Sequence, residues 1–469
     1  MESINTQTIT QAQAYEEISL KLDNIIKTNM VWDNEVSLSG AAGTGKTYLT
    51  TKLVKKLKET YHITITAPTH KALQVLRQNL IADEVENIET KTIQSFLNIK
   101  LQTDYDKGIQ KFVPAKTKDD SQTDILIVDE SSMISHDLYE YIIKAIENQR
   151  VKSILFVGDE YQLLPVDNHH CEIFNIRTKY KLDKIVRQAK DSYIITMATK
   201  ARNIIKSKQY ISIKEFFNDD AFKNELQFIN STKEFYDDFC TPDTWAKKDK
   251  VIASFTNKSV EKHNKVIRSR YWEAQNVMNP DTLLIGDKVI FQEANVINEI
   301  VIHQNSDIVE ISSANKFFQE NLQVYFWDCR DLNGKPFKVI DPDSKGRFTM
   351  VLNKLAKDAK YEKNYQERSK KWKLFFNIKD MFVDVKYIYA STIHKLQGST
   401  YETVYIDLSE IEKMADKDMM YRLLYVAITR ASKDVKILLP NNENMMLSEH
   451  QDAVLESLDK EFSMLGLDI

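Results

Sequence analysis

The sequence has few cysteines and no long apolar run. Its cysteines, Cys171, Cys240 and Cys329, are odd in number and widely separated, which argues against a disulfide framework and for a reducing compartment. His169 and His170 adjoin Cys171, but further ligands at zinc-like spacing are lacking, so we expect no structural metal. The N-terminal residues have no secretory-signal pattern, and no apolar run is long enough to cross a bilayer. We therefore expect a soluble cytoplasmic protein that does not contact a membrane.

An excess of charge of either sign is also missing. The formal net charge is −4 and the pI is about 6.2, which argues against a purely electrostatic nucleic-acid binder but leaves room for a local basic groove. The composition, 42% hydrophobic and 28% charged, is ordinary for a soluble protein. At 469 residues and 54.6 kDa the chain exceeds the usual size of one hydrophobic core, so we expect two or more domains.

A glycine-rich turn between an apolar strand and an amphipathic helix is the strongest local motif. Residues 35–57 are EVSLSGAAGTGKTYLTTKLVKKL, which contains G-x-x-x-x-G-K-[ST]. Backbone N–H groups of such a turn surround phosphate oxygens at the positive end of the helix. We predict that Lys46 reaches the β- and γ-phosphates of ATP and that the Thr47 hydroxyl is a ligand of Mg²⁺. The predicted nucleotide contacts in this loop are Gly40, Ala41, Ala42, Gly43, Thr44, Gly45, Lys46 and Thr47.

A second apolar strand ends in two acidic residues. The segment TDILIVDESSM contains a buried run over 125–128, followed by Asp129 and Glu130. Beside a phosphate loop, we expect Asp129 to hold Mg²⁺ through water and Glu130 to orient and deprotonate the attacking water. Taken alone, two acids at a strand end are often a simple strand cap. Together with the loop they predict ATP hydrolysis, a reaction that kinases, transporters and protein unfoldases also perform.

Hydroxyl and other polar side chains follow further predicted strands. The segment ITITAPTHKALQVL places Pro68, Thr69 and His70 after a strand, and TKTIQSFLNI places Thr92 and Ser95 at the start of a helix. Taken singly, such hydroxyls are usually helix caps. Repeated along one edge of a sheet, they predict a row of contacts to the backbone of DNA.

A further strand is followed by a turn that contains Gln162, in SILFVGDEYQLLPV. A glutamine there can contact the γ-phosphate and report its loss to a neighbouring loop. At this point the chain resembles a family. The segments GAAGTGKT, APTHKA, TIQSFL, VDESSM, GDEYQLLPV, LDKIVRQ, TIHKLQGST and LLYVAITRA occur in the order found in superfamily 1 helicases. The third, fifth and sixth segments are most similar to the RecD-like branch, and the length and the lysine-rich insert are most similar to Dda-like phage helicases.

The resemblance implies further nucleotide contacts. Gln13, in ITQAQAY, matches the glutamine that contacts the adenine edge, with a solvent-facing helix glutamine as the alternative. Arg187 in KIVRQ and Arg430 in YVAITRA match two arginines that reach the γ-phosphate from the second motor domain. A guanidinium group suits the spread negative charge of phosphoryl transfer. Gln397 and Gly398, in TIHKLQGST, are expected to approach the nucleotide.

The resemblance also implies further DNA contacts. Thr392 and His394 are candidates, with a buried structural histidine as the alternative for His394. Asn257, in VIASFTNKSVEKHN, is expected to contact a DNA phosphate or to cap its helix. Phe112 lies in a predicted hairpin that meets the fork in this family, where it either wedges against the first base pair or packs the hairpin on the body.

The strand–helix alternation predicts an α/β protein with parallel sheets flanked by helices. The resemblance implies that these form two tandem RecA-like P-loop motor domains. A β-hairpin pin and an SH3-like barrel with a helical tower or hook are expected as inserts. The lysine-rich helical stretch either contacts single-stranded DNA by charge and stacking or is a solvated helix with its aromatics packed inward. KYIYA and TVYID are expected to be neighbouring strands of the second motor sheet. The predicted boundaries are 1–97 and 119–185 (first motor domain), 98–118 (hairpin), 186–285 and 386–469 (second motor domain) and 286–385 (barrel and tower).

We therefore expect an enzyme that uses ATP and Mg²⁺ to move 5′→3′ on single-stranded DNA and to separate duplex strands. The polarity follows from the resemblance, because the lysine-glycine-leucine version of TIHKLQG typical of the 3′→5′ class is missing. Expected partners are single-stranded DNA, the DNA fork, a single-strand binding protein and replication or recombination proteins. We expect a monomer in the cytosol of a bacterial or phage-infected cell. The alternatives are an RNA-directed helicase and an ATP-dependent switch that binds DNA without unwinding it.

Overall fold

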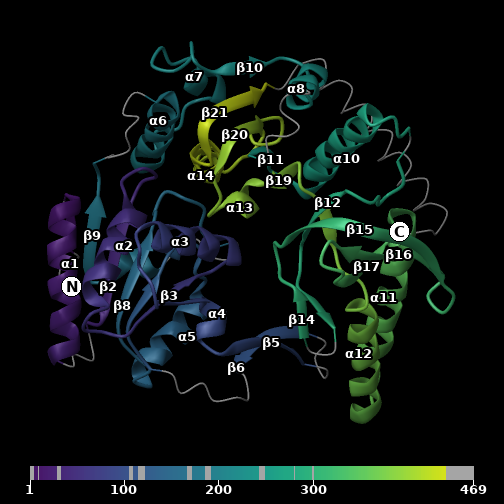
Figure 1. Cartoon of the computed structure of the whole chain (residues 1–469), viewed down its shortest axis with the longest axis horizontal. Helices are drawn as coiled ribbons and strands as arrows, with labels where there is room; N and C mark the ends of the chain where they lie inside the picture. Colours follow the sequence, from purple (N-terminus) through teal and green to yellow (C-terminus); the bar gives the residue numbers. More distant parts are fainter. Residues whose placement is uncertain are drawn as a thin grey trace. The chain divides into compact units, whose positions relative to one another are not determined.

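The protein forms two compact units, and each contains a parallel β-sheet (Figure 1). The first unit comprises Met1–Ile195, Trp272–Ile388 and Gln397–Ser399, and the second comprises Thr196–Tyr271, Tyr389–Leu396 and Thr400–Ile469. The computed structural model describes residues 5–8, 10–28, 33–104, 109–114, 122–165, 172–184, 192–241, 249–278, 280–297 and 300–439. Of these, 5–8, 100–104 and 109–112 are described by their backbone alone.

The first unit is built on a parallel sheet of seven strands. In order across the sheet these are β1 (Asn5–Thr8), β9 (Thr178–Leu182), β2 (Glu35–Gly40), β8 (Val151–Gly158), β7 (Thr123–Val128), β3 (Ile63–Ala67) and β4 (Glu89–Thr92). Parallel neighbours need crossover connections, which here include helices. The carboxyl ends of all these strands lie at one edge of the sheet, so the loops that follow β2, β7 and β8 meet there.

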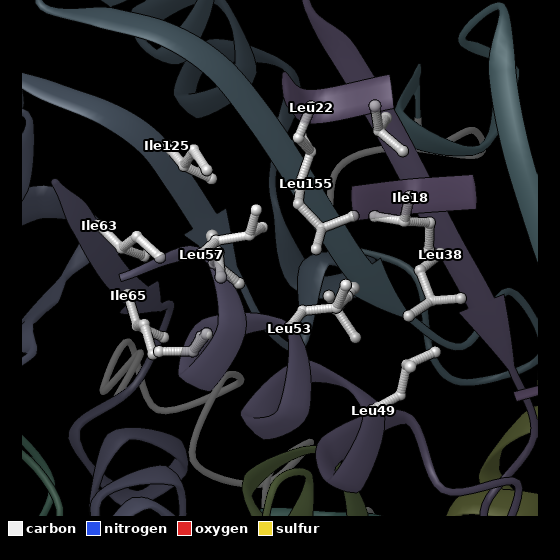
Figure 2. Packing of buried hydrophobic residues seen from close by; sticks show 14 of the residues in the cluster. Ile18, Leu22, Leu38, Leu49, Leu53, Leu57, Ile63, Ile65, Ile125 and Leu155 are labelled. Atoms are coloured by element: carbon white, nitrogen blue, oxygen red, sulfur yellow. The ribbon is translucent and has the colours of Figure 1, made fainter. Parts of the chain in front are cut away.

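The helices of this parallel-sheet region pack on the sheet through apolar faces. They are α1 (Gln11–Thr28), α2 (Lys46–Leu57), α3 (His70–Ala82), α4 (Ile93–Phe96) and α5 (His136–Glu147), with the 3-10 turns η1 (Ser131–Met133) and η2 (Glu172–Asn175). In α2, Leu49, Leu53 and Leu57 recur every fourth residue, which places them on one face. They pack in one core with Leu38 of β2 and Leu155 of β8 (Figure 2). Each such side chain contributes about 1.5–3 kcal/mol on burial, which holds the helix after the phosphate loop on the sheet.

A two-stranded hairpin follows α4. Its strands, β5 (Ile99–Asp104) and β6 (Ile109–Pro114), pair antiparallel over residues for which the sequence predicts a hairpin. Phe112 lies on β6 opposite Leu101, but its side chain lies outside the described part of the chain.

The second unit contains a parallel sheet of five strands. In order these are β10 (Gln227–Ile229), β21 (Ala431–Leu438), β20 (Tyr401–Asp407), β11 (Lys250–Ser254) and β19 (Ala390–Thr392). Helices lying wholly or mostly in this unit are α6 (Tyr193–Ser207), α7 (Ile213–Phe217), α8 (Thr232–Phe239), α10 (Asn257–Ala274), α13 (Ile393–Leu396) and α14 (Lys417–Thr429). Both units are therefore α/β structures with parallel sheets, in agreement with the strand–helix alternation.

An antiparallel insert belongs to the first unit. Its sheet has the order β17 (Pro336–Ile340), β16 (Val324–Asp331), β15 (Ile308–Gln319), β12 (Lys288–Phe291) and β18 (Val385–Tyr387). A separate hairpin consists of β13 (Asn295–Ile297) and β14 (Ile300–His303). Between β17 and β18 the chain forms η3 (Pro342–Ser344), α11 (Lys345–Lys360) and α12 (Tyr365–Lys379), and the two helices lie side by side (Figure 1). The identity of this insert as an SH3-like barrel stays a prediction.

One expected strand pairing is wrong. Lys386 and Tyr387, in KYIYA, pair with β12 of the insert, and only the chain from Ala390 joins the sheet of the second unit. In that sheet β11 separates β19 from β20. The apolar pattern of KYIYA does not reveal that it is divided between two sheets. No helix among the described residues is long and apolar enough to cross a membrane.

Candidate nucleotide and nucleic-acid sites

The phosphate loop connects β2 to α2 at the carboxyl edge of the first sheet. Gly45 has φ +82°, a left-handed conformation that glycine adopts without steric cost. Lys46 Nζ donates to the backbone carbonyls of Gly40 at 2.6 Å and Ala41 at 3.1 Å. Thr44 is fully buried, and its hydroxyl donates to the carbonyl of Ala41 at 2.8 Å. The loop is therefore closed on itself, with the Lys46 ammonium inside its curve.

A glutamine that the motif does not contain braces this loop. Gln11, the first residue of α1, donates through Nε2 to the carbonyl oxygen of Thr44 at 2.8 Å. A Cβ on Gly45 would lie 1.9 Å from that nitrogen, so glycine is also needed there for space. Gln13 is instead exposed, and its Oε1 accepts from the backbone N–H and the hydroxyl of Thr10, both at 3.0 Å. The sequence does not predict the contact of Gln11 with the loop, because nothing distinguishes this glutamine except its position at a helix start, two residues before Gln13.

The two acids follow β7 in a strained turn. The Asp129 N–H donates to the carbonyl of Thr66 at 2.9 Å, which ties the end of β7 to β3. Glu130 has φ 48° and ψ 40°, a left-handed conformation that costs an ordinary residue about 1–2 kcal/mol. Burial, together with the charge of Glu130, raises the pKa of Asp129 to about 7, while the charge of Lys46 acts in the opposite direction. The ammonium and the two carboxylates thus form one electrostatic site.

The turn that carries the acids packs on the end of β8. A Cβ on Gly158 would lie 2.6 Å from Ser131 Oγ and 3.2 Å from the backbone nitrogen of Ser132. Only a residue without a side chain allows this approach. Gln162 follows in the next turn, is 3% exposed and donates its N–H to the carbonyl of Asp159 at 3.2 Å. Gln162 is therefore buried in the turn after β8, and its contact to the γ-phosphate stays a prediction.

The residues predicted to hold Mg²⁺ fit its chemistry. Thr47 lies in the first turn of α2 and Asp129 follows β7, so both belong to the same edge of the sheet. Hydroxyl and carboxylate oxygens are hard ligands, and Mg²⁺ combines one or two of them with water and substrate phosphates. The high pKa of Asp129 describes the site with neither metal nor nucleotide; a dication beside the carboxylate favours its charged form.

Residues 397–399 group with the first unit, although the chain on either side belongs to the second. Gln397 is 6% exposed, and its Nε2 lies 3.5 Å from the carbonyl oxygen of Leu163, directly after Gln162. Gly398 has φ +72°, and a Cβ there would lie 3.4 Å from the Cβ of Ala72 in α3. This segment therefore contacts the turn after β8 and the first turn of α3.

Threonines cap the helices that follow two neighbouring strands of the first sheet. Thr69 caps α3 and accepts from the N–H of Ala72 at 3.2 Å. Thr92 caps α4 and accepts from the N–H of Ser95 at 3.2 Å. These oxygens satisfy helix N–H groups, while Ser95 and His70 are exposed beside them. The capping role is thus present for both threonines, and each cap presents the positive end of a helix.

The second unit has a similar pair of caps, but at one of them the Glu410 carboxylate accepts from the Thr256 N–H at 3.2 Å and from the Thr256 hydroxyl at 2.9 Å. Thr256 accepts from the N–H of Ser259 at 3.1 Å at the start of α10. Thr392 accepts from the N–H of Lys395 at 3.4 Å at the start of α13. Asn257 is the first residue of α10 and is exposed, so the cap of this helix is Thr256. The expected phosphate contact of Asn257 stays a prediction.

The two units repeat one arrangement in detail. Ala67, the last residue of β3, pairs with Thr92, and Ser254, the last residue of β11, pairs with Thr392. The other capping threonine of each unit lies two residues after the end of a strand: Thr69 after β3 and Thr256 after β11. The helices after Thr92 and Thr392 are both four residues long. Each sheet therefore presents two adjacent helix N-termini at its edge.

The histidines beside these caps have lowered pKa values. Partial burial lowers the pKa of His70, and burial lowers the pKa of His394, which lies near Phe255. A neutral imidazole offers a hydrogen bond but no ion pair. Each of these helix starts therefore has a histidine with a lowered pKa beside its capping hydroxyl.

Comparison with known proteins identifies both sheets. A family model described as an AAA domain matches residues 24–168, and one described as a UvrD-like helicase C-terminal domain matches residues 387–438. The ATP-dependent DNA helicase dda of Enterobacteria phage T4 is 27% identical over 436 residues, covering 86% of this chain and 94% of the phage protein. The chain is therefore similar to superfamily 1 helicases in both of its parallel-sheet regions.

Other relatives are helicases of the Pif1 group. The ATP-dependent DNA helicase Pif1 of Campylobacter jejuni is 23% identical over 456 residues, covering 88% of this chain and 89% of that protein. A solved structure of Pif1 helicase from Bacteroides in complex with ADP-AlF3 and single-stranded DNA has a TM-score of 0.45 at 17% identity, covering 93% of this chain and 97% of that one.

Among the remaining predicted residues, Arg430 is held within its own unit. It is 6% exposed, its Nε donates to the carbonyl of Val426 at 3.2 Å, and a terminal nitrogen donates to the Thr429 hydroxyl at 3.2 Å. It ends α14, at the carboxyl end of a helix where a cation is favoured. Arg187 lies outside the described residues.

Proposed function

We propose that this protein is an ATP-dependent DNA helicase that moves 5′→3′ along single-stranded DNA and separates the strands of a duplex. Its two parallel-sheet regions are RecA-like motor domains, and ATP is hydrolysed with Mg²⁺ at the phosphate loop of the first. The similarity to dda and Pif1, which are ATP-dependent DNA helicases, supports this activity.

The nucleotide chemistry rests on three side chains of the first unit. Lys46 binds the β- and γ-phosphates, because its ammonium already lies inside the loop at the carbonyls of Gly40 and Ala41. Glu130 accepts a proton from the attacking water. Gln162, which is buried in the turn after β8, contacts the γ-phosphate. Bound Mg²⁺ would be held by Thr47 and Asp129 and would neutralise charge on the phosphates. Gln13 contacts the adenine, and Arg187, Arg430, Gln397 and Gly398 complete the nucleotide site.

The observation that carries the DNA part is the repeated pair of threonine-capped helix starts, at Thr69 and Thr92 in one unit and at Thr256 and Thr392 in the other. Helix N-termini bind anions, and contacts to phosphates position a nucleic acid without reading its bases. The proposed contacts are Pro68, Thr69, His70, Thr92, Ser95, Asn257, Thr392 and His394, with Phe112 of the hairpin as the wedge.

The protein moves along DNA when the helix starts of the two sheets bind and release the DNA backbone in alternation. A nucleotide that binds one arrangement of the units more tightly than another shifts the population toward it, and hydrolysis reverses the shift. The 5′→3′ direction is supported by the segments GDEYQLLPV and HKLQGST. A monomer suffices for this cycle, because one chain contains both edges.

Strand displacement from tailed duplexes tests the proposal. With ATP, a 5′-tailed duplex is expected to be unwound, while a 3′-tailed duplex and a blunt duplex are not. Lys46→Ala serves as the control: it should abolish ATP turnover and unwinding while leaving DNA binding measurable. Unwinding from the 3′ tail alone would overturn the direction, and persistent turnover in Lys46→Ala would overturn the assignment of the loop.

Two alternatives give different results in the same assays. A switch that binds DNA without unwinding predicts DNA-stimulated ATP hydrolysis with no displacement from either tail. An RNA-directed helicase predicts stronger stimulation of hydrolysis by single-stranded RNA than by DNA of the same sequence.

A further inference from the structure

The helical pair α11–α12 concentrates positive charge in an acidic chain. Residues 345–379 contain 11 lysines and arginines but only 3 aspartates and glutamates, a net charge of +8, whereas the whole chain has −4. Most exposed charge on soluble proteins is a mixture of both signs. An imbalance of this size in 35 consecutive residues therefore marks a surface that faces negative charge.

Most of these cations have no carboxylate partner. In the described structure Lys370 pairs with Glu367 and Lys371 with Glu362, which uses two of the three acids. The cations that are exposed and form no ion pair with a described residue are Lys345, Arg347, Lys354, Lys357, Lys360, Lys363 and Lys373. The charge is thus available to a ligand.

Three of these cations form a stripe along α11. Arg347, Lys354 and Lys357 are separated by seven and three residues, and Met350 and Tyr361 continue the same spacing. Residues three, four or seven apart share one face of a helix, so all of these side chains lie on one exposed face. Over ten residues the three cations span about 15 Å. A straight row of that length matches an extended polyanion better than a small ion.

The aromatic residues of the pair point inward. Trp372 is 7% exposed and Phe376 is 5% exposed, and both pack with Ala359 and Phe375 between the helices. Phe348 packs at the base of α11 against Phe382. Binding of single strands by stacking needs exposed aromatic faces beside the cations. Here only Tyr361 and Tyr365 are largely exposed aromatics within the pair, so the surface suits a phosphate backbone more than unpaired bases.

We propose that the α11–α12 pair binds the phosphate backbone of double-stranded DNA, through Arg347, Lys354 and Lys357. This rests on the proposed function, which supplies a duplex next to the single strand on which the motor moves. The contact is to phosphates and is independent of sequence. This contact holds the duplex by charge alone. It is separate from the proposed contacts between the helix N-termini and the single strand.

The test compares two DNA probes with the full chain. One is a duplex with a 5′ single-stranded tail, and the other is the tail alone. Dissociation constants are measured by fluorescence anisotropy over a range of NaCl concentrations for the wild type and for Arg347→Gln/Lys354→Gln/Lys357→Gln. The matched control replaces three exposed lysines of the second unit, Lys206→Gln/Lys208→Gln/Lys214→Gln.

The triple variant on α11 is expected to bind the tailed duplex about tenfold more weakly at 0.1 M salt, with the slope of log K against log salt shallower by about 2–3. Its affinity for the tail alone and its ATP hydrolysis with single-stranded DNA should match the control. Equal affinity of both variants for the tailed duplex would overturn the proposal, as would an equal loss on the tail alone. Failure of the proposed function is distinct, because the wild type would then displace no strand from the 5′-tailed duplex, whatever the affinities of the two triple variants.

Discussion

The side-chain amide of Gln11 donates to the backbone carbonyl of Thr44 at 2.8 Å, across 33 residues of sequence. A trans peptide is planar, so its C=O and N–H point in opposite directions. By holding the carbonyl of Thr44, Gln11 therefore turns the N–H of Gly45 away from α1. That N–H is one of the donors with which the loop surrounds a phosphate.

Replacing Gln11 by Ala should weaken binding of every nucleotide equally. Loss of one hydrogen bond costs about 1 kcal/mol, so KM for ATP is expected to rise about fivefold with little change in kcat. Gln13→Ala is the matched comparison, because Gln13 is the proposed adenine contact: it should lower the preference for ATP over GTP, which Gln11→Ala leaves intact. Steady-state kinetics with both nucleotides measures this, and an unchanged KM in Gln11→Ala would contradict the bracing role.

Glu130→Gln should separate binding from hydrolysis. The amide keeps the shape of the side chain in its left-handed turn but cannot accept a proton from water. Multiple-turnover hydrolysis is expected to fall by about 10²-fold or more, while ATP affinity stays within a few-fold. The variant should also remain on DNA in its ATP-bound form. Rapid filter binding with labelled ATP and DNA measures both, and normal turnover would refute the role of Glu130.

Thr92→Val and Thr392→Val should each weaken DNA binding by about three- to tenfold, since each removes a capping oxygen worth about 1 kcal/mol and so disorders a helix start. Thr→Ser at the same positions keeps the oxygen and should restore binding. ATP affinity without DNA should not change in any of the four variants. Anisotropy with a single-stranded probe gives the affinities. If only one of the two valine substitutions weakened DNA binding, the two sheet edges would not be equivalent in binding DNA.

A buried network in the second unit should control stability at low pH. His263 Nε2 donates to Asp407 Oδ2 at 2.9 Å, and its Nδ1 shares a hydrogen bond of 2.9 Å with the Tyr236 hydroxyl. The hydrogen bonds and charge of His263 and the hydrogen bonds from Ser409 outweigh burial and lower the pKa of Asp407. A carboxyl group with a lowered folded-state pKa stabilises the fold above its unfolded pKa of about 3.9, and this contribution fades as the pH falls.

Asp407→Asn should therefore lower the free energy of unfolding most at pH 7, by about 1–3 kcal/mol, because His263 loses its charged partner. The difference from wild type should shrink as the pH is lowered from 6 toward 3.5. Urea denaturation followed by circular dichroism at several pH values measures it. A difference that is independent of pH would show that the ionised form of Asp407 is not what stabilises this unit.

The chemical core of the nucleotide site is predictable because its geometry is local. The spacing of Gly40, Gly45 and Lys46 dictates a loop between a strand and a helix, and Lys46 lies where the motif requires. The capping threonines are predictable for the same reason: an oxygen at the start of a helix satisfies a donor three residues later. That each sheet has two adjacent capping threonines is seen only when the two sheets are compared.

Contacts between distant segments could not be predicted. Gln11 meets Thr44 only because α1 packs beside α2, and nothing in either segment specifies that packing. Lys386 and Ala390 lie four residues apart with a continuous β pattern, yet they pair in different sheets. The aromatics of α12 fit either a stacking surface or a core, and the choice depends on α11 lying against them. In each example tertiary packing decides between local alternatives.

The charge of α11 and α12 also has a kinetic meaning. With +8 confined to 35 residues and a total of −4, the other residues carry −12 between them. A polyanion approaching by diffusion is therefore attracted to the α11–α12 pair. At low ionic strength the DNA is therefore oriented relative to the protein before any short-range contact forms. Salt weakens this effect because it shortens the Debye length. The speed with which the protein finds a duplex end, as well as its affinity, should thus depend on these two helices.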